Sequence, residues 1–112
     1  LVLASASERV FVAGADLKTI SEASDDQLHR YLEYGSRVFC MLGTLHCPTV
    51  AAINGAALGG GLELPMHCDA MVAAPPAPRD GNPGKPYPVG LPEAGLGLCP
   101  GWGGTNLLPA WE

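Results

Sequence analysis

Residues 54–64 read NGAALGGGLEL, and this stretch decides the fold. An apolar run over 49–53 stops at Asn54-Gly55, and three consecutive glycines then lead to Glu63. The pattern predicts a strand, a tight turn and a helix that begins near Gly61. Glycine lets the backbone pass close to a ligand, and the first N–H groups of a helix are unpaired. The triplet therefore predicts an anion site with Glu63 at its edge, unless these glycines only relieve crowding in a plain strand–helix connection.

The composition is that of one modest globular domain. The chain has 112 residues, of which 47% are hydrophobic and 15% charged. The net charge is −5 and the six basic residues are scattered, which argues against nucleic acid or an anionic membrane as the main partner. No apolar run approaches the ~20 residues of a membrane span, and no signal peptide pattern opens the chain. We expect a cytoplasmic protein, or a mitochondrial or peroxisomal one in a eukaryote.

The four cysteines are expected to be reduced thiols of the core. They lie far apart, form no C-x-x-C pair and have mostly apolar neighbours, which favours buried thiols over disulfides or metal ligands. They are Cys40, Cys47, Cys68 and Cys99.

Local signals predict several helices and strands around the glycine triplet. Ser24 and Gln27 form a capping-box pattern, and apolar residues then recur at helical spacing until Gly43 or Cys47-Pro48 ends the helix. The runs at 49–53 and 69–74 predict strands, the first buried on both faces, and their strand–helix–strand order predicts parallel, right-handed neighbours. Pro65 suits the intervening helix only if it lies within the first turn.

The two ends of the chain carry further expectations. Residues 1–4 are typical of a buried strand and begin without methionine, so we expect the chain to be part of a longer protein. Near the other end, Thr105 is expected to cap a last short helix that stops near Pro109.

Two turn segments complete the pattern. Residues 75–88 contain six prolines and two glycines, which predicts a loop that cannot hold a hydrogen-bonded ladder. A second glycine-rich segment follows over 89–105 and encloses Glu93, which would need a partner if it were buried. Earlier in the chain, Gly14 predicts a sharp bend, and taken alone it indicates an ordinary turn in which Asp16 caps a short helix.

Three segments follow one another along the chain: 11–17 (FVAGADL), 48–69 (PTVAAING through GGGLEL to CD) and 90–105 (GLPE through PGWGGT). In this order they resemble the enoyl-CoA hydratase/isomerase (crotonase) superfamily. The resemblance implies an α/β fold, a crotonase-like spiral of ββα turns, in which 1–112 form a partial domain with a Pro-rich loop at 75–88. Only the central part of the family domain is matched. The opening strands and the C-terminal helices, which in relatives close the acyl pocket and support trimer assembly, are expected to lie outside this sequence.

The resemblance also implies the roles of particular residues. The backbone N–H groups of Ala15 and Gly60 would form the oxyanion hole for the thioester carbonyl. Glu63 and Glu93 would flank a water molecule, one helping it to attack Cβ and the other supplying a proton to Cα. Further contacts to substrate would come from Ala13, Gly14, Asp16, Leu17, Gly59, Gly61, Pro92 and Gly101.

The expected function is hydration of a 2-enoyl-CoA thioester by an enoyl-CoA hydratase. The alternatives are an enoyl-CoA isomerase or another crotonase-fold acyl-CoA enzyme, and a truncated, non-catalytic CoA-binding module. No metal or redox cofactor is expected, because coenzyme A belongs to the substrate, and relatives suggest a homotrimer or hexamer. The chain departs from the family pattern at Pro65, at 106–110 and in the long loop. This loop would either alter acyl-chain choice or be a disordered excursion.

Overall fold

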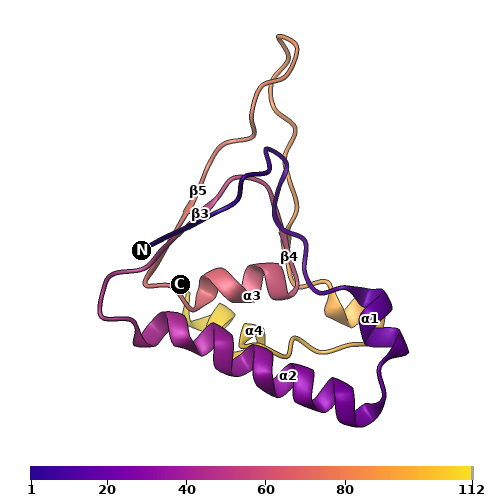
Figure 1. Cartoon of the computed structure of the whole chain (residues 1–112). Helices are drawn as coiled ribbons and strands as arrows, with labels where there is room; N and C mark the ends of the chain where they lie inside the picture. The colour runs from indigo at the N-terminus through magenta and orange to yellow at the C-terminus, as the bar shows by residue number, and fades with distance from the viewer. Residues whose placement is uncertain (112) are drawn as a thin grey trace.

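The computed structural model describes residues 1–111 and consists of three successive turns of a spiral (Figure 1). Each turn has two strands followed by helical segments. The first turn contains β1 (Val2–Ala4), β2 (Val10–Val12), α1 (Leu17–Glu22), α2 (Asp25–Cys40) and the 3-10 helix η1 (Met41–Thr44). The second contains β3 (Val50–Ile53), β4 (Ala56–Leu58) and α3 (Gly60–Met66). The third contains β5 (Ala70–Ala73), β6 (Val89–Gly90), η2 (Glu93–Leu96), α4 (Gly104–Leu107) and η3 (Leu108–Ala110).

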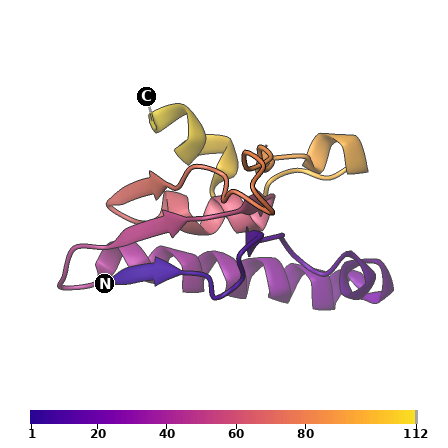
Figure 2. The same cartoon turned by 90° about the horizontal axis from the view of Figure 1, so that it is seen from above.

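The two strands of each turn belong to different sheets. The first strands form a parallel sheet in the order β1-β3-β5, and the second strands form another in the order β2-β4-β6. In Figure 1 the sheets form two arms that meet at the top, with α3 and then α2 across the base. Figure 2, seen from above, places α3 between α2 and α4. The predicted ββα spiral and the parallel pairing of 49–53 with 69–74 are confirmed.

The glycine-rich stretch contains a strand that the sequence analysis missed. Asn54-Gly55 forms a bend between the sheets, and Ala56–Leu58 is the short strand β4 rather than part of one tight turn. A Cβ at Gly55 would lie 2.3 Å from the carbonyl oxygen of Arg9, so this position needs glycine to pass the corner before β2. Three residues of the type Ala-Ala-Leu carry too weak a β pattern to predict the strand.

The helix after Ser24 is confirmed with its capping box. The Gln27 N–H donates to the Ser24 hydroxyl at 3.3 Å, and the Ser24 N–H donates to the Gln27 side chain at 2.9 Å. The α-helix ends earlier than predicted, at Cys40, and the chain then tightens into η1, which contains Gly43. The length of about four turns agrees with the apolar spacing, but this spacing continues through the change of helix type, so the pattern alone did not place the end of α2 at Cys40.

Several burial and capping predictions were wrong. Strand β1 lies at a sheet edge with Val2 exposed, and β3 alternates between buried and partly buried residues instead of being buried on both faces. Pro65 is the sixth residue of α3, beyond its first turn, and there removes one intrahelical hydrogen bond. Thr105 lies inside α4, whose cap is Gly103 at φ 116° with no side-chain bond.

The core is small and contains only one of the four cysteines. Its buried members are Phe11, Ala51, Ile53, Ala57 and Cys68. The other three cysteines are exposed, which corrects the prediction of four core thiols, and all four are free. Burial raises the pKa of the Cys68 thiol, because the thiolate would lose its hydration.

Hydrogen bonds between Thr49 and Asp69 connect the start of β3 to the start of β5. Thr49 is 0% exposed, and its N–H and hydroxyl donate to Asp69 Oδ2 at 2.7 and 2.9 Å. The Asp69 N–H returns a bond to the Thr49 hydroxyl at 2.9 Å. The bonds from the Thr49 backbone and then from its hydroxyl lower the pKa of the Asp69 carboxyl, because they favour its charged form.

This bond set makes stability depend on pH in acid. Because the Asp69 pKa is lower in the folded than in the unfolded state, its contribution is complete above an unfolded pKa of about 4 and disappears as pH falls through the folded pKa. Asp69→Asn keeps the shape but does not titrate. Urea unfolding between pH 2.5 and 6 should therefore show a shallower acid loss of unfolding free energy for this variant.

A matched variant is Thr49→Val, which removes the hydroxyl donor and keeps the N–H donor. It should retain part of the slope that Asp69→Asn loses. Equal slopes for the native chain and Asp69→Asn would contradict the assignment.

Candidate active site

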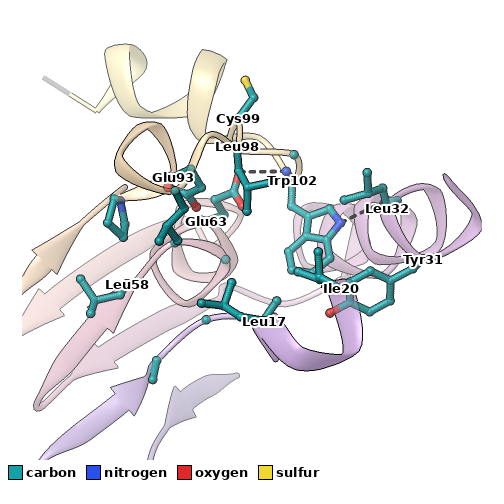
Figure 3. A pocket seen from close by; sticks show the side chains of 18 residues that line it. Leu17, Ile20, Tyr31, Leu32, Leu58, Glu63, Glu93, Leu98, Cys99 and Trp102 are labelled. Carbon is teal, nitrogen blue, oxygen red and sulfur yellow. Dashed lines mark hydrogen bonds between the residues drawn. The ribbon is translucent and has the colours of Figure 1, made fainter. Parts of the chain in front are cut away.

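The carboxyl ends of β2, β4 and β6 open onto one cavity of about 480 Å³ (Figure 3). Residues that follow neighbouring parallel strands meet at the same sheet edge, which explains why three distant segments contribute. The cavity brings together ten of the residues expected in the site. These are Ala13, Gly14, Ala15, Leu17, Gly59, Gly60, Glu63, Pro92, Glu93 and Gly101.

Glu63 is a buried carboxylate held by backbone N–H groups. It is 2% exposed, and its Oε1 accepts bonds from the N–H groups of Trp102 and Gly104, each at 2.8 Å. It lies in the first turn of α3, where the positive end of the helix favours a negative charge. Charge-assisted bonds of this kind offset the cost of burial. With Oε1 occupied, Oε2 is the oxygen nearest the glycine triplet, 3.8 Å from the position of a Cβ at Gly60.

Glu93 is placed against the same glycines at the start of η2. Its Oε1 would lie 2.7 Å from a Cβ at Gly59, and its Oε2 is buried without a hydrogen-bond partner within residues 1–111. Gly59 and Gly60 are consecutive, so both carboxyl groups lie near one short piece of backbone. Figure 3 shows the Glu63 and Glu93 side chains close to each other in the pocket. A buried acceptor without a partner costs about 1–3 kcal/mol, so this oxygen is available to a ligand.

The N–H groups of Ala15 and Gly60 are free donors at this cavity. Neither makes a hydrogen bond to an acceptor in the described part of the chain, and both residues line the cavity. Gly14, at φ 103°, brings its turn against the end of β4, where an added Cβ would lie 2.9 Å from the Leu58 carbonyl oxygen. Gly59, at φ 56° and ψ −128°, turns the chain into α3 at the same point. Close packing at Gly14 thus places Ala15 in the lining of the same cavity as Gly60.

Two residues expected in the site lie outside the cavity lining. Asp16 caps α1, accepting from the Lys18 N–H at 3.0 Å and the Thr19 hydroxyl at 2.8 Å. The Thr19 bond, followed by the Lys18 bond, lowers the pKa of the Asp16 carboxyl. Gly61 lies under the site, where an added Cβ would fall 1.9 Å from the Val12 carbonyl oxygen, so it allows α3 to pack on β2.

Trp102 is the central residue that the sequence analysis did not assign. Its N–H donates to Glu63, its carbonyl lies 2.7 Å from His67 Nε2, and its indole N–H donates to the Leu32 carbonyl at 3.0 Å. The ring packs edge-on against Tyr31 with centroids 5.3 Å apart. Its hydrogen-bond partners lie 35 to 70 residues away in sequence, and the only local signal was an aromatic residue between the glycines of P-G-W-G-G.

The rest of the cavity wall is mostly apolar and comes from α1, α2 and the segment around η2. Together with the two carboxylates and the free N–H groups, this makes a site suited to acid–base chemistry on an apolar substrate with a carbonyl group. The remaining lining residues are Ile20, Tyr31, Leu32, Leu58, Leu96, Leu98, Cys99 and Trp102.

Two other kinds of site are not found in the described residues. Within 1–111, no group of three or more His, Cys, Asp or Glu side chains is placed to hold a metal ion. No helix in that range is both long enough and apolar enough to cross a membrane.

The spiral of ββα turns and a carboxylate-lined cavity at its strand ends define a crotonase-type α/β domain. Residues 1–110 match the family described as enoyl-CoA hydratase/isomerase, and the chain belongs to that family. Crotonyl-CoA hydratase of Syntrophomonas wolfei is 38% identical over 109 residues, which are 97% of this chain and 38% of that protein. Short-chain-enoyl-CoA hydratase of Clostridium acetobutylicum is 40% identical over 108 residues, 96% of this chain and 38% of its own length.

Solved structures show the same relation. An enoyl-CoA hydratase from Bacillus anthracis superimposes with a TM-score of 0.82 at 38% identity, covering 97% of this chain and 38% of that one. The chain thus spans about two fifths of the length of these relatives, and they confirm the crotonase-type fold expected from the sequence.

The close contact between the Trp102 ring and α2 predicts that alanine at Gly35 lowers stability, whereas alanine at a glycine without such a contact does not. In Gly35→Ala, the new Cβ would lie 2.5 Å from the indole atoms Cε2 and Nε1. Overpacking of this kind costs about 1–3 kcal/mol, which exceeds the gain of about 1 kcal/mol in helix propensity. Urea unfolding should show a destabilised variant.

The matched control is Gly43→Ala in η1, where the nearest atom to the new Cβ is 3.9 Å away. That variant should be neutral or stabilised by up to about 1 kcal/mol. Equal stability changes in the two variants would show that the indole does not press on Gly35.

Proposed function

We propose that this part of the crotonase domain forms the catalytic centre of an enoyl-CoA hydratase, which adds water across the 2,3 double bond of a 2-enoyl-CoA thioester. The observation that carries the proposal is the pair of carboxyl groups, Glu63 and Glu93, which lie close together against Gly59 and Gly60 of the glycine triplet. Glu93 has one oxygen, Oε2, without a partner in the described residues, and Glu63 has its Oε2 turned towards the triplet. A water molecule between the two side chains would therefore meet two acid–base groups.

The proposed step divides the work between the two carboxylates. One side chain, ionised, accepts a proton from water as the water oxygen bonds to Cβ. The other begins as the carboxylic acid and donates its proton to Cα, so the two side chains exchange protonation states in the step. Negative charge develops meanwhile on the thioester oxygen, which would accept hydrogen bonds from the free N–H groups of Ala15 and Gly60. Donors aimed in advance at a developing oxyanion are each worth about 3–4 kcal/mol of barrier. The addition needs proton transfer and an oxyanion hole, so we propose no metal or redox cofactor beyond the coenzyme A of the substrate.

The apolar wall of the cavity and the names of the relatives support a proposal for the substrate. The apolar side chains from α1 and η2 suit an acyl chain, and the relatives include proteins named for crotonyl-CoA and short-chain enoyl-CoA. We propose an acyl-CoA thioester as the substrate and a homotrimer or hexamer as the assembly of the complete protein.

An enoyl-CoA isomerase is the second candidate. It needs one carboxylate that moves a proton between two carbons, and Glu93 has a buried oxygen with no partner in residues 1–111, whereas Glu63 spends one oxygen on Trp102 and Gly104. This difference favours Glu93 as the single base if only one carboxylate acts.

The test compares Glu63→Gln and Glu93→Gln in a protein that carries this chain within a complete domain. In the Glu63→Gln variant the new amide oxygen can still accept the two backbone N–H bonds, so the fold should persist while proton transfer is lost. Each variant should lower kcat for hydration by about 10²- to 10⁴-fold with acyl-CoA binding nearly unchanged, and the double variant should be far from additive.

Glu33→Gln is the matched control, because Glu33 pairs with Arg37 on the surface of α2. It should leave kcat unchanged. Loss of activity in Glu93→Gln alone would favour the isomerase, and full activity in both variants would reject acid–base roles for the pair.

A further inference from the structure

The proline-rich segment is an ordered hairpin rather than a disordered excursion. Its tip holds the antiparallel bridge Arg79–Asn82, with N–H···O distances of 3.0 and 2.8 Å. Asp80 and Gly81 have φ values of 50° and 76°, as a type I′ turn requires. The segment thus holds one isolated bridge and no extended ladder, in line with the expectation from its prolines. Figure 1 shows the hairpin projecting from the top of the molecule.

The arms and base of the hairpin are also fixed. A Cβ at Gly84 would lie 2.2 Å from the Pro76 carbonyl oxygen, so the two arms are in contact. At the base, the Tyr87 hydroxyl donates to the Ala74 carbonyl and lies 3.4 Å from the Ile53 carbonyl oxygen. Prolines restrict the arms further, so the walls are formed before any ligand arrives.

The hairpin lies at the opposite end of a sheet from the candidate active site. It enters β6 at its amino end, whereas the active-site cavity lies beyond the carboxyl ends of β2, β4 and β6. Strands β2 and β4 have three residues each, a length of about 10 Å. The two cavities share no lining residue, so the expectation that the loop sets acyl-chain choice has no contact to support it.

A cavity of about 550 Å³ lies between the hairpin and the two other corners of the spiral. It is lined by Arg9, Arg79 and Lys85, which are three of the six basic residues of a chain with net charge −5. Glu8 and Asp80 also line it. None of these five side chains forms an ion pair within residues 1–111, where the ion pairs are Lys18–Glu22 and Arg37–Glu33.

Asn54 adds an unsatisfied acceptor to the same cavity. Its Nδ2 donates to the Ser7 carbonyl at 2.7 Å, which fixes the orientation of the amide. Its Oδ1 is buried and receives no hydrogen bond within residues 1–111. An acceptor in this state costs about 1–3 kcal/mol, and a hydroxyl donor from a ligand would recover that loss.

We propose that this cavity binds a small organic phosphate that carries a hydroxyl group. Its volume falls in the range of small-molecule sites. Two guanidinium groups and one ammonium group suit a phosphate, since arginine binds its oxygens in pairs. The ligand hydroxyl donates to Asn54 Oδ1, and the proline rings pack on its carbon skeleton. This is a second site, separate from the acyl-CoA cavity.

The probe is ribose 5-phosphate, titrated into the chain and followed by backbone amide chemical shifts. Saturable changes are expected at Asn54 and over residues 79–85. Arg79→Gln should weaken binding about tenfold or more, because it removes a charge-assisted contact. Asp80→Asn should tighten binding, because it removes a like charge while keeping a residue that accepts positive φ.

The controls distinguish binding through the phosphate from binding through the sugar, and binding at this cavity from a general effect of protein charge. Ribose alone should not bind, and gluconate, which offers a carboxylate, should bind more weakly than ribose 5-phosphate. Arg30→Gln, on the exposed face of α2, should leave the affinity unchanged. If Arg79→Gln unfolds, Lys85→Gln serves as the second variant and should also weaken binding.

Three results would overturn the proposal. They are the absence of saturable shifts with ribose 5-phosphate, equal affinity for gluconate, and an affinity that falls as much in Arg30→Gln as in Arg79→Gln or Lys85→Gln.

Discussion

The two backbone N–H bonds to Glu63 Oε1 are the constraint on which the site depends. Trp102 and Gly104 lie about forty residues beyond Glu63, yet both donate at 2.8 Å to one buried oxygen. A carboxyl group that is 2% exposed is tolerated only with such partners, so the second glycine-rich segment must close over α3. That closure also brings Glu93 to the glycine triplet and completes the wall of the cavity.

Glycine supplies the space for this closure. A Cβ at Gly60 would lie 2.7 Å from the Trp102 ring, and one at Gly104 would lie 3.0 Å from Glu63 Oε1. The glycines therefore let backbone approach backbone and carboxylate. The interpretation of the triplet as relief of crowding is thus seen directly in these contacts, and its role as an anion site stays a prediction.

The sequence predicted the features that depend on local signals. The capping box at Ser24, the strands at 49–53 and 69–74 and the cap at Asp16 each follow from residues within one or two turns of chain. Strand β4 was not predictable, because three small residues gain their strand geometry only from β2 and β6. The Trp102 contacts and the exposure of three cysteines depend on residues that meet only in the folded chain.

Trp102 joins the wall of the cavity to its carboxylate. Its indole N–H is hydrogen-bonded to the α2 backbone beside Tyr31, and its backbone N–H is hydrogen-bonded to Glu63. A shift of α2 would therefore act on the indole and, through Trp102, on the peptide N–H that is hydrogen-bonded to Glu63. The apolar surface that would contact the acyl chain of a substrate and the carboxyl group that would act at its thioester end are therefore connected through Trp102. Anyone who reshapes this pocket through α2 would also be adjusting the alignment of the carboxylate.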